Sequence, residues 1–263
     1  MINKHPFHIV DLRPWPLINS INLFNAIFLS LKFFKTPNQI NISFSIIAVL
    51  ALIFTRFLWW RDICRERSYQ GHHTHKVYLR IKISIVLFIS REVIFFFRFF
   101  WAYFHFRLAP EFEISNTWPP TIIETVNPYH LPFLNRIILI RSGASITWCH
   151  FAILNKKYLI SIFRIILTII LGLVFTSIQV LEYINISFSI NDNVYGSVFF
   201  MLTGFHGTHV IIGTIFLIVN YVRLLTGQIN NKHHFSLEAS AWYWHFVDVV
   251  WIYLYIFVYW WWF

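Results

Sequence analysis

Apolar residues fill long runs of this chain, and short polar segments separate the runs. About 20 apolar residues in a helix are enough to cross the roughly 30 Å apolar core of a bilayer. The runs do not alternate between apolar and polar positions, as the consecutive Phe95, Phe96 and Phe97 illustrate, so they do not fit a membrane β-barrel. The pattern predicts seven helices, near residues 15–35, 40–60, 79–107, 130–154, 158–182, 194–225 and 236–262.

Composition supports a membrane protein. The 263 residues are 57% hydrophobic and only 12% charged, whereas a soluble domain is typically about 25% charged. Lipid cannot satisfy the open edges of a sheet, so helices are the expected spanning elements. No internal repeat or linker divides the chain. We therefore expect one all-α membrane domain over residues 1–263, with seven transmembrane helices.

The net charge of +10 is distributed unevenly. If the seven spans alternate in direction, most Lys and Arg outside the spans lie on the side of the N-terminus. The cations expected on the opposite side are Lys32, Lys35, Arg107 and Arg136. The acids expected on that opposite side are Glu111, Glu113, Glu124, Glu182 and Asp192. The positive-inside rule then places the N-terminus inside and the C-terminus outside, and the basic excess indicates topology rather than a nucleic-acid partner.

The third apolar run contains Arg91, Glu92 and Arg98. A charge at mid-bilayer costs about 2.5–3.5 kcal/mol on insertion scales. Arg91 and Arg98 share a helix face, and Glu92 lies about 100° from Arg91. We therefore expect these arginines, and Arg141, to find acceptors on another helix or chain rather than to neutralise Glu92. Burial disfavours a charged carboxylate, so we predict that Glu92 is protonated near neutral pH.

The first inside loop, residues 59–76, is basic and aromatic. Trp59 and Trp60 suit an interfacial aromatic belt, and the cations that follow suit anionic lipid headgroups or simple topological anchoring. The stretch His72-His73-Thr74-His75 suggests a metal site, but adjacent loop histidines seldom converge on one ion without further ligands. Hydrogen bonds to lipid or backbone are the favoured interpretation.

The sixth run places His206 and His209 on one helix face. Axial haem ligation is one interpretation. A helix-packing seam is favoured, because Gly204, Gly207 and Gly213 allow another backbone to approach closely.

The last run carries His245 and Asp248, also three residues apart. A local structural pair is favoured over a proton relay. A proton-coupled transporter would show related halves with broken helices, and no such symmetry is visible. Cys64 and Cys149 are single cysteines in different elements, and no phosphate loop, dinucleotide fingerprint or nucleophile elbow occurs. The chain therefore presents no catalytic or metal-ligating set.

Several long motifs together resemble subunit III of the cytochrome c oxidases, in order from His5 to Trp262. They include "HPFHIVDLRPWPL", "WWRDICRERSYQGHHT", "EVIFFFRFFWAYFH", "YGSVFFMLTGFHGTHVIIGTIFLIV" and "HHFSLEASAWYWHFVDVVWIYLYIFVYWWW". The resemblance implies a two-helix group and a five-helix group, with phospholipids in a V-shaped cleft between them. It also implies a non-redox subunit that packs against subunit I, supports proton uptake and protects the oxidase during turnover.

The resemblance implies particular sites and partners. Lipid-contacting positions of the family fall on Trp59, Trp60, Glu66, His73, Arg223 and His233, and its membrane-embedded carboxylate falls on Glu92. The lipids would be phospholipids such as cardiolipin, phosphatidylethanolamine or phosphatidylglycerol. Haem a and copper are expected in partner subunits, which include subunits I and II and accessory subunits. The expected location is the mitochondrial inner membrane, with the N-terminus in the matrix and the C-terminus in the intermembrane space.

Overall fold

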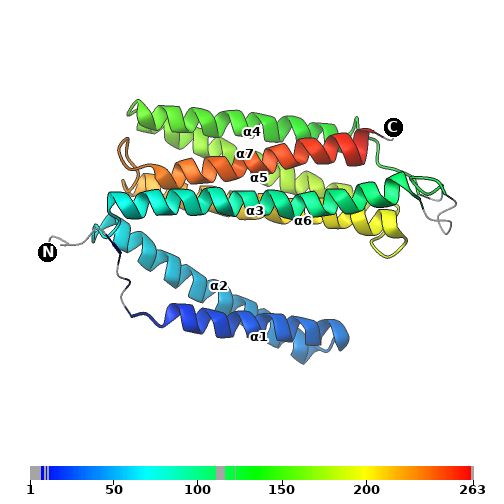
Figure 1. The fold of residues 1–263 in the computed structure, drawn as a ribbon, viewed down its shortest axis with the longest axis horizontal. Coiled ribbons are helices and arrows are strands. Elements are labelled where there is room, and N and C mark those ends of the chain that lie inside the picture. Colours follow the sequence, from blue (N-terminus) through cyan, green and yellow to red (C-terminus); the bar gives the residue numbers. More distant parts are fainter. Residues whose placement is uncertain (1–6, 9, 11, 111–115, 122, 262–263) are drawn as a thin grey trace. The chain divides into compact units, whose positions relative to one another are not determined.

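The computed structural model describes residues 7–261 except 9, 11, 111–115 and 122. Within these residues every regular element is a helix (Figure 1). The elements are α1 (Trp15–Lys35), α2 (Gln39–Ser68), α3 (His75–Leu108), α4 (Leu131–Leu154), α5 (Tyr158–Asn185), α6 (Val194–Leu225), α7 (Phe235–Leu254) and the π-helix η2 (Tyr255–Trp260).

Local sequence explains several helix ends. Proline lies in the first turn of α1 and α4, where its missing N–H is not needed. Asn193 caps α6, because its side chain accepts a hydrogen bond of 2.9 Å from the backbone N–H of Gly196. These signals agree with the predicted starts of the first, fourth and sixth helices.

The largest difference from the prediction concerns α2, which continues to Ser68 rather than ending near residue 60. The prediction that residues 59–68 belong to a loop is therefore wrong. Hydropathy falls after Trp60, but the following residues include good helix formers and no glycine or proline before Gly71. Gly71 then takes a left-handed conformation with φ of +68°, which an L side chain rarely adopts.

Six helical segments are long and apolar enough to cross a membrane: α1, α2, α4, α5, α6 and α7 together with η2. The 34-residue helix α3 is not among them, because Arg91, Glu92 and Arg98 interrupt its apolar stretch. The structure thus confirms seven long helices over the described residues, and six of them are apolar spans by length and composition.

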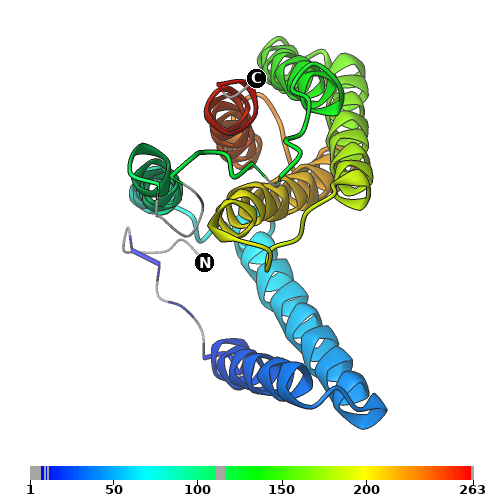
Figure 2. The same cartoon turned by 90° about the vertical axis from the view of Figure 1, so that its right-hand side faces the viewer.

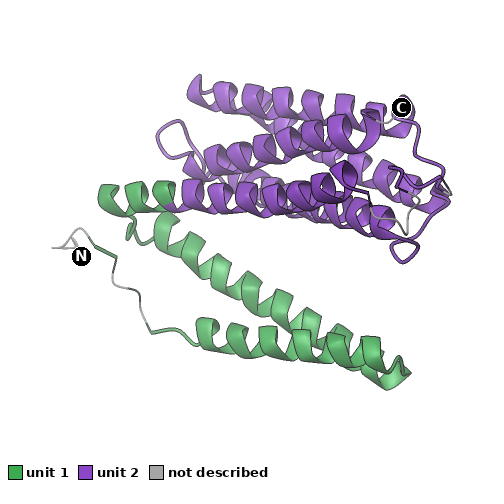
Figure 3. Ribbon diagram, turned by 45° about the vertical axis from the view of Figure 1, so that its right-hand side comes forward, with its two compact units in different colours: residues 1–83 green, residues 84–263 purple. Residues whose placement is uncertain are grey.

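The chain divides into two compact units, residues 1–83 and 84–263 (Figure 3). In unit 1, α1 and α2 pack along a seam of small and polar residues. Ala26 and Ala48 are buried there, and the Thr55 hydroxyl lies 3.4 Å from Asn19 Oδ1. Arg56 Nε donates to the same oxygen at 3.3 Å, so a polar network joins these two helices.

In unit 2, α7 packs against α4 and α6, and α6 packs against α5 (Figure 2). The indole of Trp244 is fully buried and donates from Nε1 to Ser142 Oγ at 2.8 Å. Room for this ring comes from glycines on two other helices: a Cβ built at Gly172 or Gly213 would lie 2.8 or 2.9 Å from its atoms. Trp244 therefore sits where α4, α5, α6 and α7 meet.

Candidate functional site

The C-terminal end of α2 carries a buried carboxylate, Glu66, which is only 3% exposed. Arg13 forms an ion pair with Glu66 Oε1, and His8 Nε2 lies 3.0 Å from Oε2. A second tie is the 2.8 Å hydrogen bond from the Trp15 indole to Asp62, one turn earlier on α2. These contacts hold the segment before α1 against α2, and they give the buried carboxylate the partners that it needs.

A cavity of about 460 Å³ lies beside this carboxylate within unit 1. Its polar lining comes from His8, Arg13, Glu66 and His73, and Trp59 lies in its wall. The rest of the lining is mostly aliphatic: Val10, Leu12, Pro16, Ile63, Val77 and Ile81. An apolar cavity whose polar end holds a guanidinium and two imidazoles suits a molecule that has an apolar chain and a polar head.

His8, Glu66 and His73 are the described residues that could also hold a metal ion, because their ligand atoms all lie within 4.8 Å of one another. The His8 ring packs against His72 and His73, with centroids 5.5 and 5.6 Å apart. However, Arg13 already engages the only carboxylate of the group. An anion is therefore the better electrostatic match for this end of the cavity.

The remaining residues expected to contact lipid are not part of the lining of this cavity. Trp60 is 55% exposed on α2, with the Arg56 guanidinium 5.9 Å from its ring centroid. Arg223 lies in the last turn of α6, where its Nε donates to Gln228 at 3.2 Å. His233 is exposed in the loop before α7. Trp59, Trp60, Glu66 and His73 thus belong to unit 1, whereas Arg223 and His233 belong to unit 2.

Glu92 on α3 has two partners in unit 2. Arg91 Nη2 lies 3.2 Å from one carboxyl oxygen, and His209 Nε2 on α6 lies 3.2 Å from the other. The expectation that Arg91 leaves Glu92 unpaired is therefore wrong. The two Cα–Cβ bonds do point about 100° apart, but the long arginine side chain is flexible enough to reach back to its neighbour.

The hydrogen bonds of His209 limit where its protons can be. Its Nδ1 lies 2.6 Å from the backbone oxygen of Phe205. A carbonyl oxygen only accepts, so Nδ1 must carry hydrogen. Nε2 then either accepts from a protonated Glu92 or donates to the carboxylate as an imidazolium. The protonated form of Glu92 stays a prediction.

Two further arginines, Arg98 and Arg141, are exposed on unit 2. Arg98 lies on α3 and Arg141 lies on α4. Because both side chains are exposed, neither is enclosed by the helices of unit 2. The prediction that these arginines find acceptors on another helix or chain stays a prediction.

His206 packs as a core side chain. It is 1% exposed, its ring centroid lies 5.1 Å from that of Trp251, and Phe175 contacts it at 5.7 Å. These aromatic contacts support the packing interpretation of His206. Of the glycines predicted to form a seam, Gly213 does so against Trp244, whereas a Cβ at Gly207 would meet nothing within 4 Å. The seam is therefore confirmed at Gly213, and at Gly207 no described residue of this chain fills the space, so the seam there stays a prediction.

His245 does not form the expected hydrogen-bonded pair with Asp248. Its Nε2 lies 3.1 Å from the hydroxyl of Thr147 on α4, and Asp248 Oδ1 is buried without a hydrogen-bond partner among the described residues. Both side chains border a groove of about 580 Å³ at the surface of unit 2.

One polar cluster was missed by the sequence analysis. Glu182 was expected at the outer surface, but it is 2% exposed and accepts a 2.7 Å hydrogen bond from the Tyr259 hydroxyl of η2. The sequence offered one indication of this cluster: Gln179 and Glu182 are three residues apart and therefore share one face of α5. The partner, 77 residues away, could not be inferred from that spacing.

Comparison with known proteins gives a consistent result. Residues 5–263 match the family described as cytochrome c oxidase subunit III. Similar proteins named cytochrome c oxidase subunit 3 include one from Rhipicephalus sanguineus, which is 49% identical over 93% of this chain and 94% of its own length. The one from Patiria pectinifera is 47% identical over 95% of each chain. The one from Chondrus crispus is 45% identical over 94% of this chain and 91% of its own.

Proposed function

Since the chain belongs to the cytochrome c oxidase subunit III family, we propose that it acts as the non-redox core subunit of a proton-pumping terminal oxidase. In this role it packs directly against subunit I and belongs to the same complex as subunit II and accessory subunits. Haem a and copper are carried by the partner subunits. It holds phospholipids in a cleft between a two-helix and a five-helix group and supports proton uptake by subunit I.

The cavity in unit 1 carries the lipid part of this proposal. Arg13 and His73 supply a guanidinium and an imidazole at its polar end, and the aliphatic side chains of Ile63, Val77 and Ile81 line the remainder. This arrangement matches a phospholipid, with the phosphate beside the cations and an acyl chain along the apolar wall. Trp59 borders the cavity, and tryptophan is enriched at the headgroup boundary of membranes.

Glu66 contributes differently from the other predicted lipid contacts. Its carboxylate is buried beneath Arg13 and His8, so its first role is to fix those two side chains at the edge of the cavity. Arg223 and His233 add positive and hydrogen-bonding groups to the inner end of unit 2. Direct contact of each of these residues with a headgroup is part of the proposal.

Lipid analysis of the purified oxidase tests this part. His73→Ala removes a cavity side chain, whereas His75→Ala removes an exposed histidine two residues away that is not part of the cavity lining. We expect the first variant to lose about one tightly bound phospholipid per complex by mass spectrometry and the second to keep it. Equal lipid content in both variants and the wild type would contradict the proposed lipid site.

The proposal for proton uptake rests on Glu92. The carboxyl lies 3.2 Å from His209 Nε2 and 3.2 Å from Arg91 Nη2, and the rings of Phe95, Phe96 and Phe246 pack around His209. A protonated carboxyl in an apolar setting reacts with a hydrophobic carbodiimide, and a paired carboxylate does not. We expect labelling at Glu92 in the lipid-replete complex, and no labelling in a Glu92→Gln variant.

The same variant separates a supporting role from a redox role. Glu92→Gln should assemble with unchanged haem spectra and normal electron transfer, and its effect should be confined to proton uptake or resistance to turnover inactivation. Altered haem spectra, or a wild-type Glu92 that resists the carbodiimide, would contradict the proposal.

Location and orientation follow from the same proposal. The multiple membrane helices and the mitochondrial-type relatives support a mitochondrial inner-membrane subunit. The basic excess on the side of the N-terminus supports a matrix N-terminus and an intermembrane-space C-terminus. Opposite sides for the two termini require an odd number of spans. In this orientation α3 must therefore cross the membrane in addition to the six apolar segments, despite Arg91, Glu92 and Arg98.

A further inference from the structure

The surface of unit 2 carries an arginine, Arg141, near the middle of helix α4. Its side chain is exposed, and no hydrogen bond, ion pair or aromatic-ring contact joins it to any residue that the structure describes. Two nearby arginines differ in this respect. The guanidinium of Arg136 lies 5.0 Å from the ring centroid of Tyr255, and that of Arg164 on α5 lies 3.7 Å from the ring centroid of Trp148.

Arg141 lies deep in the membrane. Helix α4 is long and apolar enough to span the bilayer, and Arg141 is ten residues after Leu131 and thirteen before Leu154. These separations correspond to about 15 and 20 Å of helix. An extended arginine side chain is much shorter than either distance, and lipid phosphates lie outside the apolar core. The guanidinium therefore remains among acyl chains, which offer it no acceptor, unless another chain covers it.

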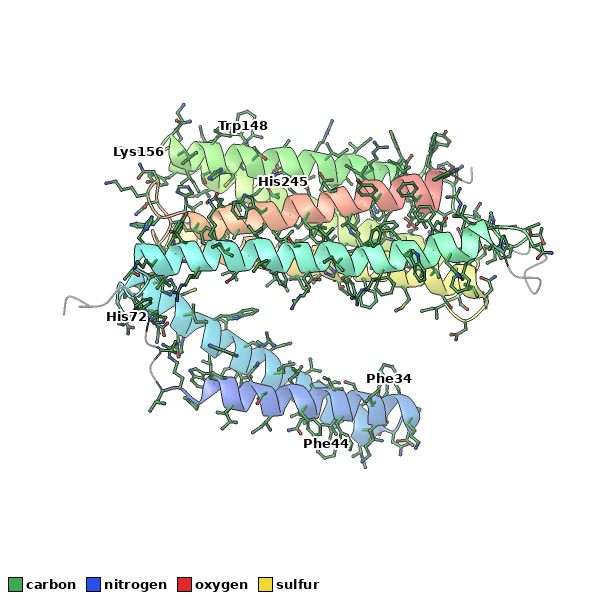
Figure 4. All side chains as sticks on the ribbon, viewed as in Figure 1. Phe34, Phe44, His72, Trp148, Lys156 and His245 are labelled. Carbon is green, nitrogen blue, oxygen red and sulfur yellow. The ribbon has the colours of Figure 1, made fainter. Side chains whose placement is uncertain are left out.

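The neighbours of Arg141 place it on the face of α4 that points out of the bundle. Trp148 is seven residues later and shares this face within about 20°. It is 54% exposed and projects from α4 away from the other helices of unit 2 (Figure 4). Ile137, one turn before Arg141, is 36% exposed. On the opposite side of the helix, Leu139 and Ile146 are fully buried, so Arg141 faces the surroundings of unit 2.

The carboxyls that unit 2 carries at membrane depth are not available to Arg141 within the described chain. Glu92 and Glu182 already have hydrogen-bond partners inside unit 2. The carboxyl of Asp248 lies against Gly143, which is two residues, and thus about 200°, around the helix from Arg141. A second copy of this chain would bring the same three carboxyls, and each of them is buried or half-buried.

We propose that the exposed face of α4 docks a transmembrane helix of another oxidase subunit, which carries an Asp or Glu side chain opposite Arg141. The unpaired charge selects this occupant, because an apolar helix or an acyl chain would leave the guanidinium without an acceptor. A carboxylate can accept two parallel hydrogen bonds from a guanidinium, and ionisable side chains inside membranes usually pair with one another.

This inference names the chemistry of one partner within the proposed function. It rests on the proposed place of the chain in an oxidase complex, and it does not depend on the lipid site or on Glu92.

Substitution of Arg141 separates an ion pair from exposure to lipid. If the partner carboxylate is present, Arg141→Leu leaves it buried and unpaired. The partner subunit should then be lost from the purified oxidase, with an occupancy at least about tenfold lower by native mass spectrometry. Arg141→Lys keeps the positive charge and should retain most of this subunit. If Arg141 only faces lipid, leucine suits the membrane better than arginine, and an unchanged subunit content in Arg141→Leu would overturn the proposal.

Photocrosslinking in the intact oxidase identifies the partner. Ile137→p-benzoylphenylalanine places the reactive group one turn from Arg141 on the same exposed face. We expect an adduct with a membrane segment of another subunit that contains Asp or Glu, and a yield about tenfold lower when Arg141→Leu is added. Adducts with lipid alone, or with a segment that lacks both acids, would contradict the proposal. Haem spectra and co-purification of subunit I report assembly separately, so failure of this inference is distinguishable from failure of the proposed function.

Discussion

Gly213 and Gly207 lie on the same helix, yet a methyl group added to each should have opposite effects. A Cβ at Gly213 would come within 2.9 Å of Trp244 Cε3 and 3.1 Å of Cζ3. That indole is fully buried and hydrogen-bonded to Ser142, so it cannot move aside without breaking a core contact. A Cβ at Gly207 would meet nothing within 4 Å.

The magnitudes follow from packing and helix propensity. Overpacking a well-packed core costs about 1–3 kcal/mol, which corresponds to an increase of about 5- to 150-fold in the population of open forms. Gly207→Ala should be neutral or stabilise by up to about 1 kcal/mol, because alanine favours the helix. A Gly213→Ala, Trp244→Phe double variant should recover part of the loss, because the smaller ring leaves room for the methyl group.

The chain contains its own reporter for this measurement. Cys149 is fully buried in the core of unit 2, while Cys64 is only half-buried in unit 1. The rate at which a thiol reagent labels Cys149 in the assembled oxidase reports opening of the core, and Cys64 serves as the internal reference. We expect the labelling rate of Cys149 to be higher in Gly213→Ala than in the wild type. In Gly207→Ala the rate should not exceed that of the wild type. Equal rates in the two variants would refute the packing argument.

Two other changes should give distinguishable results in the same oxidase. Tyr259→Phe removes the 2.7 Å hydrogen bond to the buried Glu182 and should destabilise unit 2 by about 1–3 kcal/mol. The control Tyr253→Phe, at a half-exposed tyrosine, should change stability by less than about 0.5 kcal/mol. The rate of Cys149 labelling by a thiol reagent measures both effects. In the loop before α6, hydrogen bonds from the backbone N–H and the hydroxyl of Ser189 lower the pKa of Asp192. The folded carboxylate is therefore favoured above its unfolded pKa, and this stability is lost as pH falls through the lowered folded value. Ser189→Ala should thus be less stable than wild type near neutral pH, and thermal unfolding at acid pH should show the difference disappear.

Much of the fold could be predicted because a bilayer leaves few choices. Long apolar runs must form helices that satisfy their own backbone groups, so the number of long helices and most of their starts follow from the sequence. The end of α2 did not follow, because hydropathy stops at the membrane boundary while the helix continues until its hydrogen bonding is interrupted. The family resemblance was likewise readable from the sequence, since its motifs are long.

Only the tertiary structure decided which polar and small residues meet. Helical periodicity gave the faces of Glu92, His206 and Gly213, but a face has no partner until another helix is placed against it. Glu92 meets His209, 117 residues away, and Glu182 meets Tyr259 instead of the outer surface. Periodicity depends on a few neighbouring residues, whereas these contacts depend on the rotation and depth of two helices. Packing around buried side chains such as Trp244 sets that rotation and depth.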